Sequence, residues 1–207
     1  MNSNVESIVP FNQFIDSAQG DHQHGNCGDW LSEIKEKGRI EFYKLGWPSP
    51  KFESWRYTNL NKLAKTQFFL PQDIELAELP YQDILPVDAP KIALVNGKFN
   101  RELSDLSTIS EGILVNNFQD MSDEQRALFS LENPTTLPKE GLPVKALNDA
   151  ILSDVLFIEI RPGWQSDVPL HIVSIGCGDH VGFSSKIFVS AGENSHLDIV
   201  ESHAGEY

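Results

Sequence analysis

The sequence contains few cysteines and no long apolar run. Its only two cysteines, Cys27 and Cys177, lie 150 positions apart in a chain of 207 residues. Two isolated cysteines fit a reducing compartment better than a disulfide framework. No apolar run approaches the roughly 18 residues that a membrane-spanning helix needs. Because several acidic residues precede Lys35, the first basic residue, the start fits neither a secretory signal nor a transit peptide. These absences predict a cytoplasmic protein.

Basic residues are scarce. The chain has 16 Lys and Arg against 30 Asp and Glu, which gives a formal net charge of -14. A duplex or an anionic membrane repels such a chain unless a strong basic patch offsets the charge. We therefore expect neither nucleic acid nor membrane as a partner. The 40% of hydrophobic residues are typical of a globular chain with a real core.

Sequence motifs for nucleotide binding and covalent catalysis are absent. The chain has no G-x-x-x-x-G-K-S/T loop, so it is not expected to hydrolyse ATP. It also has no G-x-S-x-G element, and no G-x-G-x-x-G precedes a predicted helix. We assign no catalytic, cofactor-binding or metal-binding residue from motifs alone.

Hydrophobic periodicity divides the chain at about residue 150. Residues 1–150 mix helices with short strands, whereas residues 151–207 are almost all strand-like. Asn96 and Gly97 predict a hairpin turn, and Ser122 with Gln125 has the spacing of a capping box. Helices are predicted over 5–18, 29–45, 59–66, 122–131 and 144–153. Pro10 is expected to interrupt the first of these helices. In the second, Trp30, Leu31 and Ile34 are expected to face inward and Gly38 to weaken the middle. Strands are predicted over 91–95, 113–115, 155–160, 170–175, 186–189 and 197–200.

The strand starts after residue 150 recur every 11 to 15 residues or so, which suggests a sandwich, a barrel or a solenoid. No helical pattern separates these strands, so βαβ units are not expected. The last strand runs nearly to Tyr207 and leaves an open edge. We expect either that another chain covers this edge or that the sequence is part of a longer protein.

Four histidines lie in or near the strand-rich part. His171, His180, His196 and His203, with Glu201 close by, could gather around a metal ion in a cupin-like barrel. Such barrels usually carry two histidines separated by one residue and followed by a glutamate, and the only such pair in this sequence, His22 and His24, lies outside the strand-rich part. The alternative is that these histidines occupy solvent positions on strands.

A second group of possible metal ligands precedes the first long predicted helix. His22, His24 and Cys27 form an H-x-H-x-x-C pattern in a glycine-rich stretch. Three such ligands could hold zinc, but a closed site needs a fourth, and no matching pair follows nearby. The stretch is therefore either a zinc-binding element or an ordinary loop.

Aromatic residues cluster near the middle of the first region. Trp47, Phe52, Trp55 and Tyr57 lie between two prolines and the next predicted helix. They either form a local core that holds this loop or provide a partner surface, since Trp and Tyr are favoured at interfaces.

Three stretches in order resemble one family. Residues 46–60, GWPSPKFESWRYTNL, are similar to the pattern G-L-P-x-x-K-x-E-x-W-K/R-Y-T-x-L near the start of SufD proteins. Residues 95–105, VNGKFNRELSD, match V-D/N-G-x-F/Y-x-x-x-L-S-D. Residues 146–150, ALNDA, with PLHI at 169–172, are similar to the entry into the β region of the family.

The resemblance implies a scaffold that works with SufB and the ATPase SufC in iron–sulfur cluster assembly. It implies an α+β fold, in which a helical region is followed by the first coils of a right-handed parallel β-helix, with domains at 1–150 and 151–207. Family members are longer, and the residues linked to cluster building would lie beyond Tyr207. We therefore transfer no site residue. Clusters commonly take four thiolates, so this chain is expected to hold none alone, although His171 or Cys177 could serve at a shared interface.

The sequence is also compatible with two other functions. The four histidines favour a cupin-like metalloenzyme, and the repeated strands favour an unrelated β-solenoid module that associates through its open edge.

Overall fold

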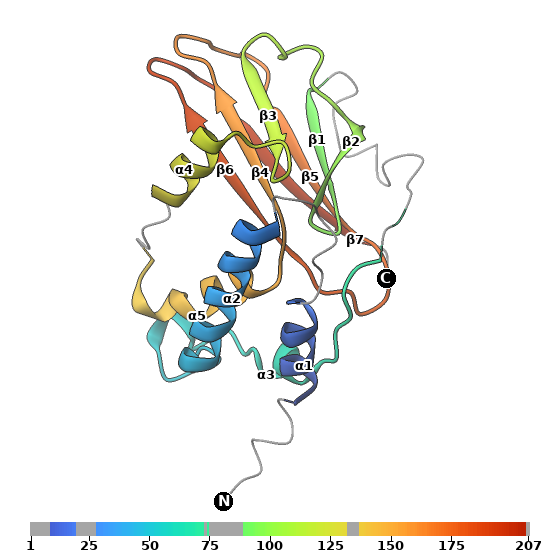
Figure 1. The fold of residues 1–207 in the computed structure, drawn as a ribbon, viewed down its shortest axis with the longest axis vertical. Helices are drawn as coiled ribbons and strands as arrows, with labels where there is room; N and C mark the ends of the chain where they lie inside the picture. The colour runs from blue at the N-terminus through green and yellow to red at the C-terminus, as the bar shows by residue number, and fades with distance from the viewer. Residues whose placement is uncertain (1–8, 20–27, 73, 75–88, 132–136, 206–207) are drawn as a thin grey trace, which may run out of the picture. The chain divides into compact units, whose positions relative to one another are not determined.

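The computed structural model describes residues 9–19, 28–72, 74, 89–131 and 137–205. The chain divides into two compact units that alternate along the sequence. The first unit takes its residues from 1–70, 132–152 and 180–184, and the second from 71–131, 153–179 and 185–207. Figure 1 shows the elements of both units. The division into domains at 1–150 and 151–207 stays a prediction.

The first unit is built mainly of helices. Its elements are α1 (Val9–Ser17), α2 (Gly28–Leu45), η1 (Glu53–Trp55), α3 (Asn61–Lys65), η3 (Lys139–Gly141) and α5 (Leu142–Ala150). Helix α2 packs along α5, as Figure 1 shows. The core of this unit joins aromatic rings from α1 and α2 to small residues of α5, namely Phe11, Phe14, Phe42, Ala146 and Ala150.

Two details of these helices differ from the sequence predictions. Pro10 was expected to interrupt the first helix, but α1 begins at Val9, so Pro10 falls in the first turn, where a helix tolerates proline. Gly38 was expected only to weaken α2. It instead allows close packing, because a Cβ there would lie 2.5 Å from the Cβ of Asp149 and 2.6 Å from the backbone nitrogen of Ala150.

The second unit is built mainly of strands. It contains β1 (Lys91–Val95), β2 (Lys98–Asp105), β3 (Ile113–Asn117), α4 (Asp123–Leu131), β5 (Leu170–Gly176) and β7 (Ile199–Gly205), with most of β4 (Leu152–Ile160) and β6 (Ser184–Ala191). One sheet has the order β2-β1-β5-β7, and the other has the order β3-β4-β6. The main core holds aliphatic side chains from both sheets.

Strand pairing within these sheets is mixed. β1 runs antiparallel to β2 and parallel to β5, with Lys91 opposite His171 and Val95 opposite Ile175. β5 also pairs in parallel with β7 from Leu170–Ile199 to Gly176–Gly205. β3 and β4 are antiparallel, with Ile113 opposite Ile160.

This pairing corrects the predicted solenoid. We expected the first coils of a right-handed parallel β-helix, and that prediction is wrong, although the broader α+β class is confirmed. The described strands form two small sheets that include antiparallel pairs. Strand spacing does not fix which strands pair: β1 and β2, which precede residue 151, share a sheet with β5 and β7, and β3 pairs antiparallel with β4.

Several predicted elements are confirmed. Asn96 and Gly97 have φ values of 49° and 80°, as a two-residue hairpin turn requires. The capping box at the start of α4 forms in both directions. The Gln125 N–H donates to the Ser122 hydroxyl at 3.2 Å, and the Ser122 N–H donates to the Gln125 side-chain oxygen at 3.1 Å. None of the helices in the described ranges is long and apolar enough to cross a bilayer.

Candidate functional site

The four strand-region histidines do not assemble into a metal site in the described part of the chain. His171 lies buried on β5, and its Nδ1 has no hydrogen-bond partner among the described residues. His196 and His203 are exposed, with Nε2 of His203 3.4 Å from a carboxylate oxygen of Glu201. His180 belongs to the helical unit. No group of three metal-ligating side chains occurs among the residues that the structure describes. These residues therefore provide no assembled centre of the cupin-like kind.

The other predicted metal ligands cannot be compared with the structure. His22, His24 and Cys27 lie outside the described residues. The zinc-binding interpretation of the H-x-H-x-x-C pattern therefore stays a prediction.

Cys177 lies beneath the β1–β2 hairpin. Its side chain is buried with Val95 and Ile175 in a small apolar cluster. The side chain of Asn96 holds its backbone on both sides, accepting from the Cys177 N–H at 2.8 Å and donating to the Cys177 carbonyl at 3.1 Å. The Asn96 N–H also donates to the Ile175 carbonyl at 2.8 Å. The family-like V-N-G stretch therefore has a structural role here, because it fixes the hairpin to the end of β5.

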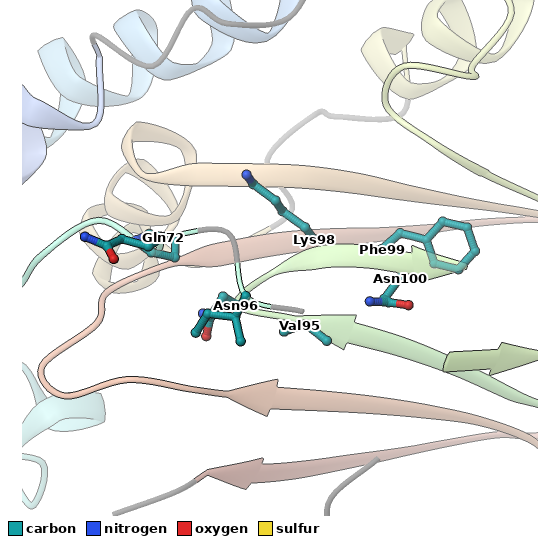
Figure 2. Close-up of a pocket in the computed structure, with 8 residues that line it drawn as sticks. Gln72, Val95, Asn96, Lys98, Phe99 and Asn100 are labelled. Carbon is teal, nitrogen blue, oxygen red and sulfur yellow. The ribbon is translucent and has the colours of Figure 1, made fainter. Parts of the chain in front are cut away.

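A hollow of about 200 Å³ lies beside the same hairpin. Figure 2 shows six of its lining residues, Gln72, Val95, Asn96, Lys98, Phe99 and Asn100. The polar groups that line it are largely engaged, since the Asn96 amide binds Cys177 and the Asn100 side-chain oxygen accepts from the Leu103 N–H. We therefore assign no ligand to this hollow.

Asp154 is a buried carboxylate that sequence reasoning missed. Its two oxygens accept three backbone N–H groups, from Phe118 at 3.1 Å, from Val155 at 2.8 Å and from Phe99 at 3.1 Å. Burial raises the pKa of the Asp154 carboxyl above its ordinary value, although the three N–H donors and Lys98 oppose that rise. The sequence did contain a sign of this arrangement. A lone aspartate at the start of a buried apolar strand needs hydrogen-bond donors around its carboxylate. Its role is to join β2, the end of β3 and β4.

The aromatic cluster of residues 47–57 separates into two kinds of side chain. Trp47 packs edge-to-face on Phe11 at 4.8 Å between ring centroids and belongs to the helical core. Trp55 is half-buried and donates its indole N–H to the Glu140 carbonyl at 2.7 Å. Phe52 and Tyr57 are exposed. The local-core interpretation therefore holds for Trp47 and Trp55, whereas the partner-surface interpretation of Phe52 and Tyr57 stays a prediction.

The last strand presents an open edge. β7 ends its sheet, pairing with β5 on one side and, in the part of the chain that the structure describes, with no strand on the other. Ile199 and Val200 on this strand are exposed, on opposite faces. An exposed strand edge offers unpaired N–H and C=O groups to another chain. The β7 edge is therefore a candidate docking surface.

The chain matches a known protein family. The family model described as the SufBD protein N-terminal region matches residues 12–172, which is about three quarters of the chain. A comparison with curated proteins finds no match. The matched range includes all three stretches that resemble the family.

Proposed function

Because the chain belongs to the SufBD protein N-terminal region family, we propose that it is a non-catalytic scaffold subunit of the Suf iron–sulfur cluster assembly machinery. It works in the cytoplasm with homologues of SufB and of the ATPase SufC. The family match is the observation that carries this proposal. The absence of an ATP-binding loop from the sequence agrees with it, because the energy then comes from a partner.

The cluster is cargo in this proposal. An iron–sulfur cluster commonly takes four thiolates, and the sequence has two cysteines that are 150 positions apart. Cys177 is buried with its backbone clamped by Asn96. The full complex therefore supplies the cluster-binding groups, and this chain contributes surface for assembly.

The β7 edge is the surface that we propose for docking. Val200 is 41% exposed on an edge strand, where main-chain groups can extend the sheet into a partner. A charge placed on such an edge opposes strand addition. Val200→Glu should therefore weaken docking without removing a core contact.

Affinity capture tests the proposal. The tagged chain should retain SufB and SufC homologues. Val200→Glu should lower the recovery of these homologues at least several-fold. Leu128→Glu on α4 is the matched control, because Leu128 is 42% exposed and does not lie on a sheet edge. Capture of neither homologue would contradict the scaffold role. Equal capture of the homologues by the wild-type chain and by Val200→Glu would show that the β7 edge does not bind them. A homodimer that is lost in Val200→Glu would show that the edge serves self-association instead.

A further inference from the structure

The turn that follows α2 is held from the inside by two tryptophans. Gly46, with φ at 70°, ends α2, and Trp47 then packs on Phe42 with ring centroids 5.4 Å apart. Trp55 is fixed by its hydrogen bond to the Glu140 carbonyl. Backbone hydrogen bonds from Phe52 to Ser49, Trp55 to Phe52 and Thr58 to Trp55 close successive turns between these points. These contacts order the segment from within the chain itself.

The side chains that this segment turns outward are aromatic and basic. Tyr57 is 87% exposed and Phe52 is 47% exposed. The Arg56 guanidinium lies over the Tyr57 ring at 5.5 Å. An exposed aromatic ring in a fixed turn provides contact area that costs little ordering on binding. We define the basic–aromatic segment as residues 51–65.

The charge of this segment is opposite to that of the chain. Residues 51–65 hold four cations, Lys51, Arg56, Lys62 and Lys65, and a single carboxylate, Glu53, in a chain of net charge -14. All four cations are exposed. Only Arg56 approaches Glu53, at 3.8 Å, and within the described ranges the three lysines have no ion-pair partner. The segment is therefore a local positive surface on an acidic protein.

We propose that the basic–aromatic segment binds an acidic protein segment in which Asp or Glu flank apolar side chains. The cations attract the carboxylates, and Phe52 and Tyr57 provide the apolar contact. A longer polyanion such as nucleic acid fits less well, because the acidic remainder of the chain repels every charge beyond the local contact. This inference goes beyond the Suf assignment, which names no role for residues 51–65.

Binding of labelled peptides to the purified full chain tests this inference. The probe is a fluorescein-labelled peptide in which aspartates and glutamates flank leucines, compared with the same peptide carrying lysines in place of the acids. Anisotropy should report binding of the acidic peptide alone, with an affinity that falls as salt rises. Lys51→Glu and Tyr57→Ala should each weaken the affinity at least about fivefold.

Two controls match these variants outside the segment. Arg161→Glu makes the same charge change at another exposed position, and Ile40→Ala removes an apolar side chain that is 56% exposed. Both should bind the peptide as the wild-type chain does. The inference is overturned if the acidic peptide does not bind, if the segment variants bind it normally, or if only an oligonucleotide or phosphatidylglycerol vesicles bind. Capture of Suf homologues is a separate measurement, so failure of one proposal is distinguishable from failure of the other.

Discussion

At the residue scale, Asn96 combines an unusual backbone conformation with a buried amide. Its φ of 49° lies in the left-handed region, where Asn and Gly are favoured. Its side chain satisfies both backbone groups of Cys177. The sequence predicted the turn but not the clamp, because nothing in a local pattern identifies a partner 81 positions away.

Substitution of Asn96 should separate these two contributions. Asn96→Gly keeps the turn but removes the clamp, which should lower the free energy of unfolding by about 2 kcal/mol. Asn96→Ala should cost roughly 1 kcal/mol more, because alanine disfavours the left-handed region. Chemical denaturation of both variants checks the order. A smaller loss of stability for Asn96→Ala than for Asn96→Gly would contradict the cost expected for alanine in the left-handed region.

Asp154 gives a prediction with a definite sign. Burial raises the pKa of its carboxyl in the folded state. The folded chain therefore binds this proton more tightly than the unfolded chain, so the contribution of Asp154 to stability is greatest below the unfolded pKa of about 3.9. That contribution falls as the pH rises through the folded pKa.

Asp154→Asn removes this titration. The stability of the wild-type chain relative to Asp154→Asn should decrease as the pH rises from below about 4 and should level off above the folded pKa. Urea denaturation of both proteins over that range measures the difference. An increase of the relative wild-type stability with pH would show that the three N–H donors outweigh burial.

Trp55 fixes the basic–aromatic segment, so its removal should lower the free energy of unfolding. Trp55→Ala removes half-buried ring contacts and the hydrogen bond to the Glu140 carbonyl, at a cost of roughly 2–4 kcal/mol. Trp55→Phe keeps most of the ring and should cost about 1 kcal/mol. Thermal melts check both variants, and a Trp55→Ala melt within a degree or two of wild type would show that Trp55 does not anchor the segment.

At the element scale, local signals predicted most helices and strands well. The capping box placed the start of α4, and the apolar runs placed β1 and β5 almost to the residue. Burial within α2 was predicted less well. Trp30, Leu31 and Ile34 were expected to face inward but are half-buried, whereas Gly38 and Phe42 are buried. Helical periodicity alone does not show that α5 needs a small residue at the point of contact.

Gly38→Ala tests that contact between helices. Alanine is intrinsically better than glycine in a helix by about 1 kcal/mol. We nevertheless expect a net loss of about 2 kcal/mol, because the new Cβ would overlap Asp149 and Ala150 on α5. Gly141→Ala is the control, since the nearest atom to its Cβ would be 3.7 Å away. A gain in stability for Gly38→Ala would show that α2 and α5 can separate without cost.

At the scale of the whole molecule, the sequence indicated the class of the fold but not its strand pairing. Strand lengths follow from local periodicity, whereas pairing depends on contacts between distant segments such as β1 and β5. Repeated strand starts therefore suggested a solenoid. In the structure, the hairpin at Asn96 pairs β1 with β2 in one sheet, and β3 pairs antiparallel with β4 in the other. The aromatic cluster showed the same limit, because its composition could not separate inward Trp55 from exposed Tyr57.

Binding to Suf partners is the property on which the proposed function of this chain rests. Co-expression of the tagged chain with SufB and SufC homologues, followed by size-exclusion chromatography and mass measurement of the complex, tests that claim most directly. We predict one stable species that contains all three chains at a fixed ratio. Elution of the tagged chain alone, with both homologues in separate fractions, would rule out the scaffold role.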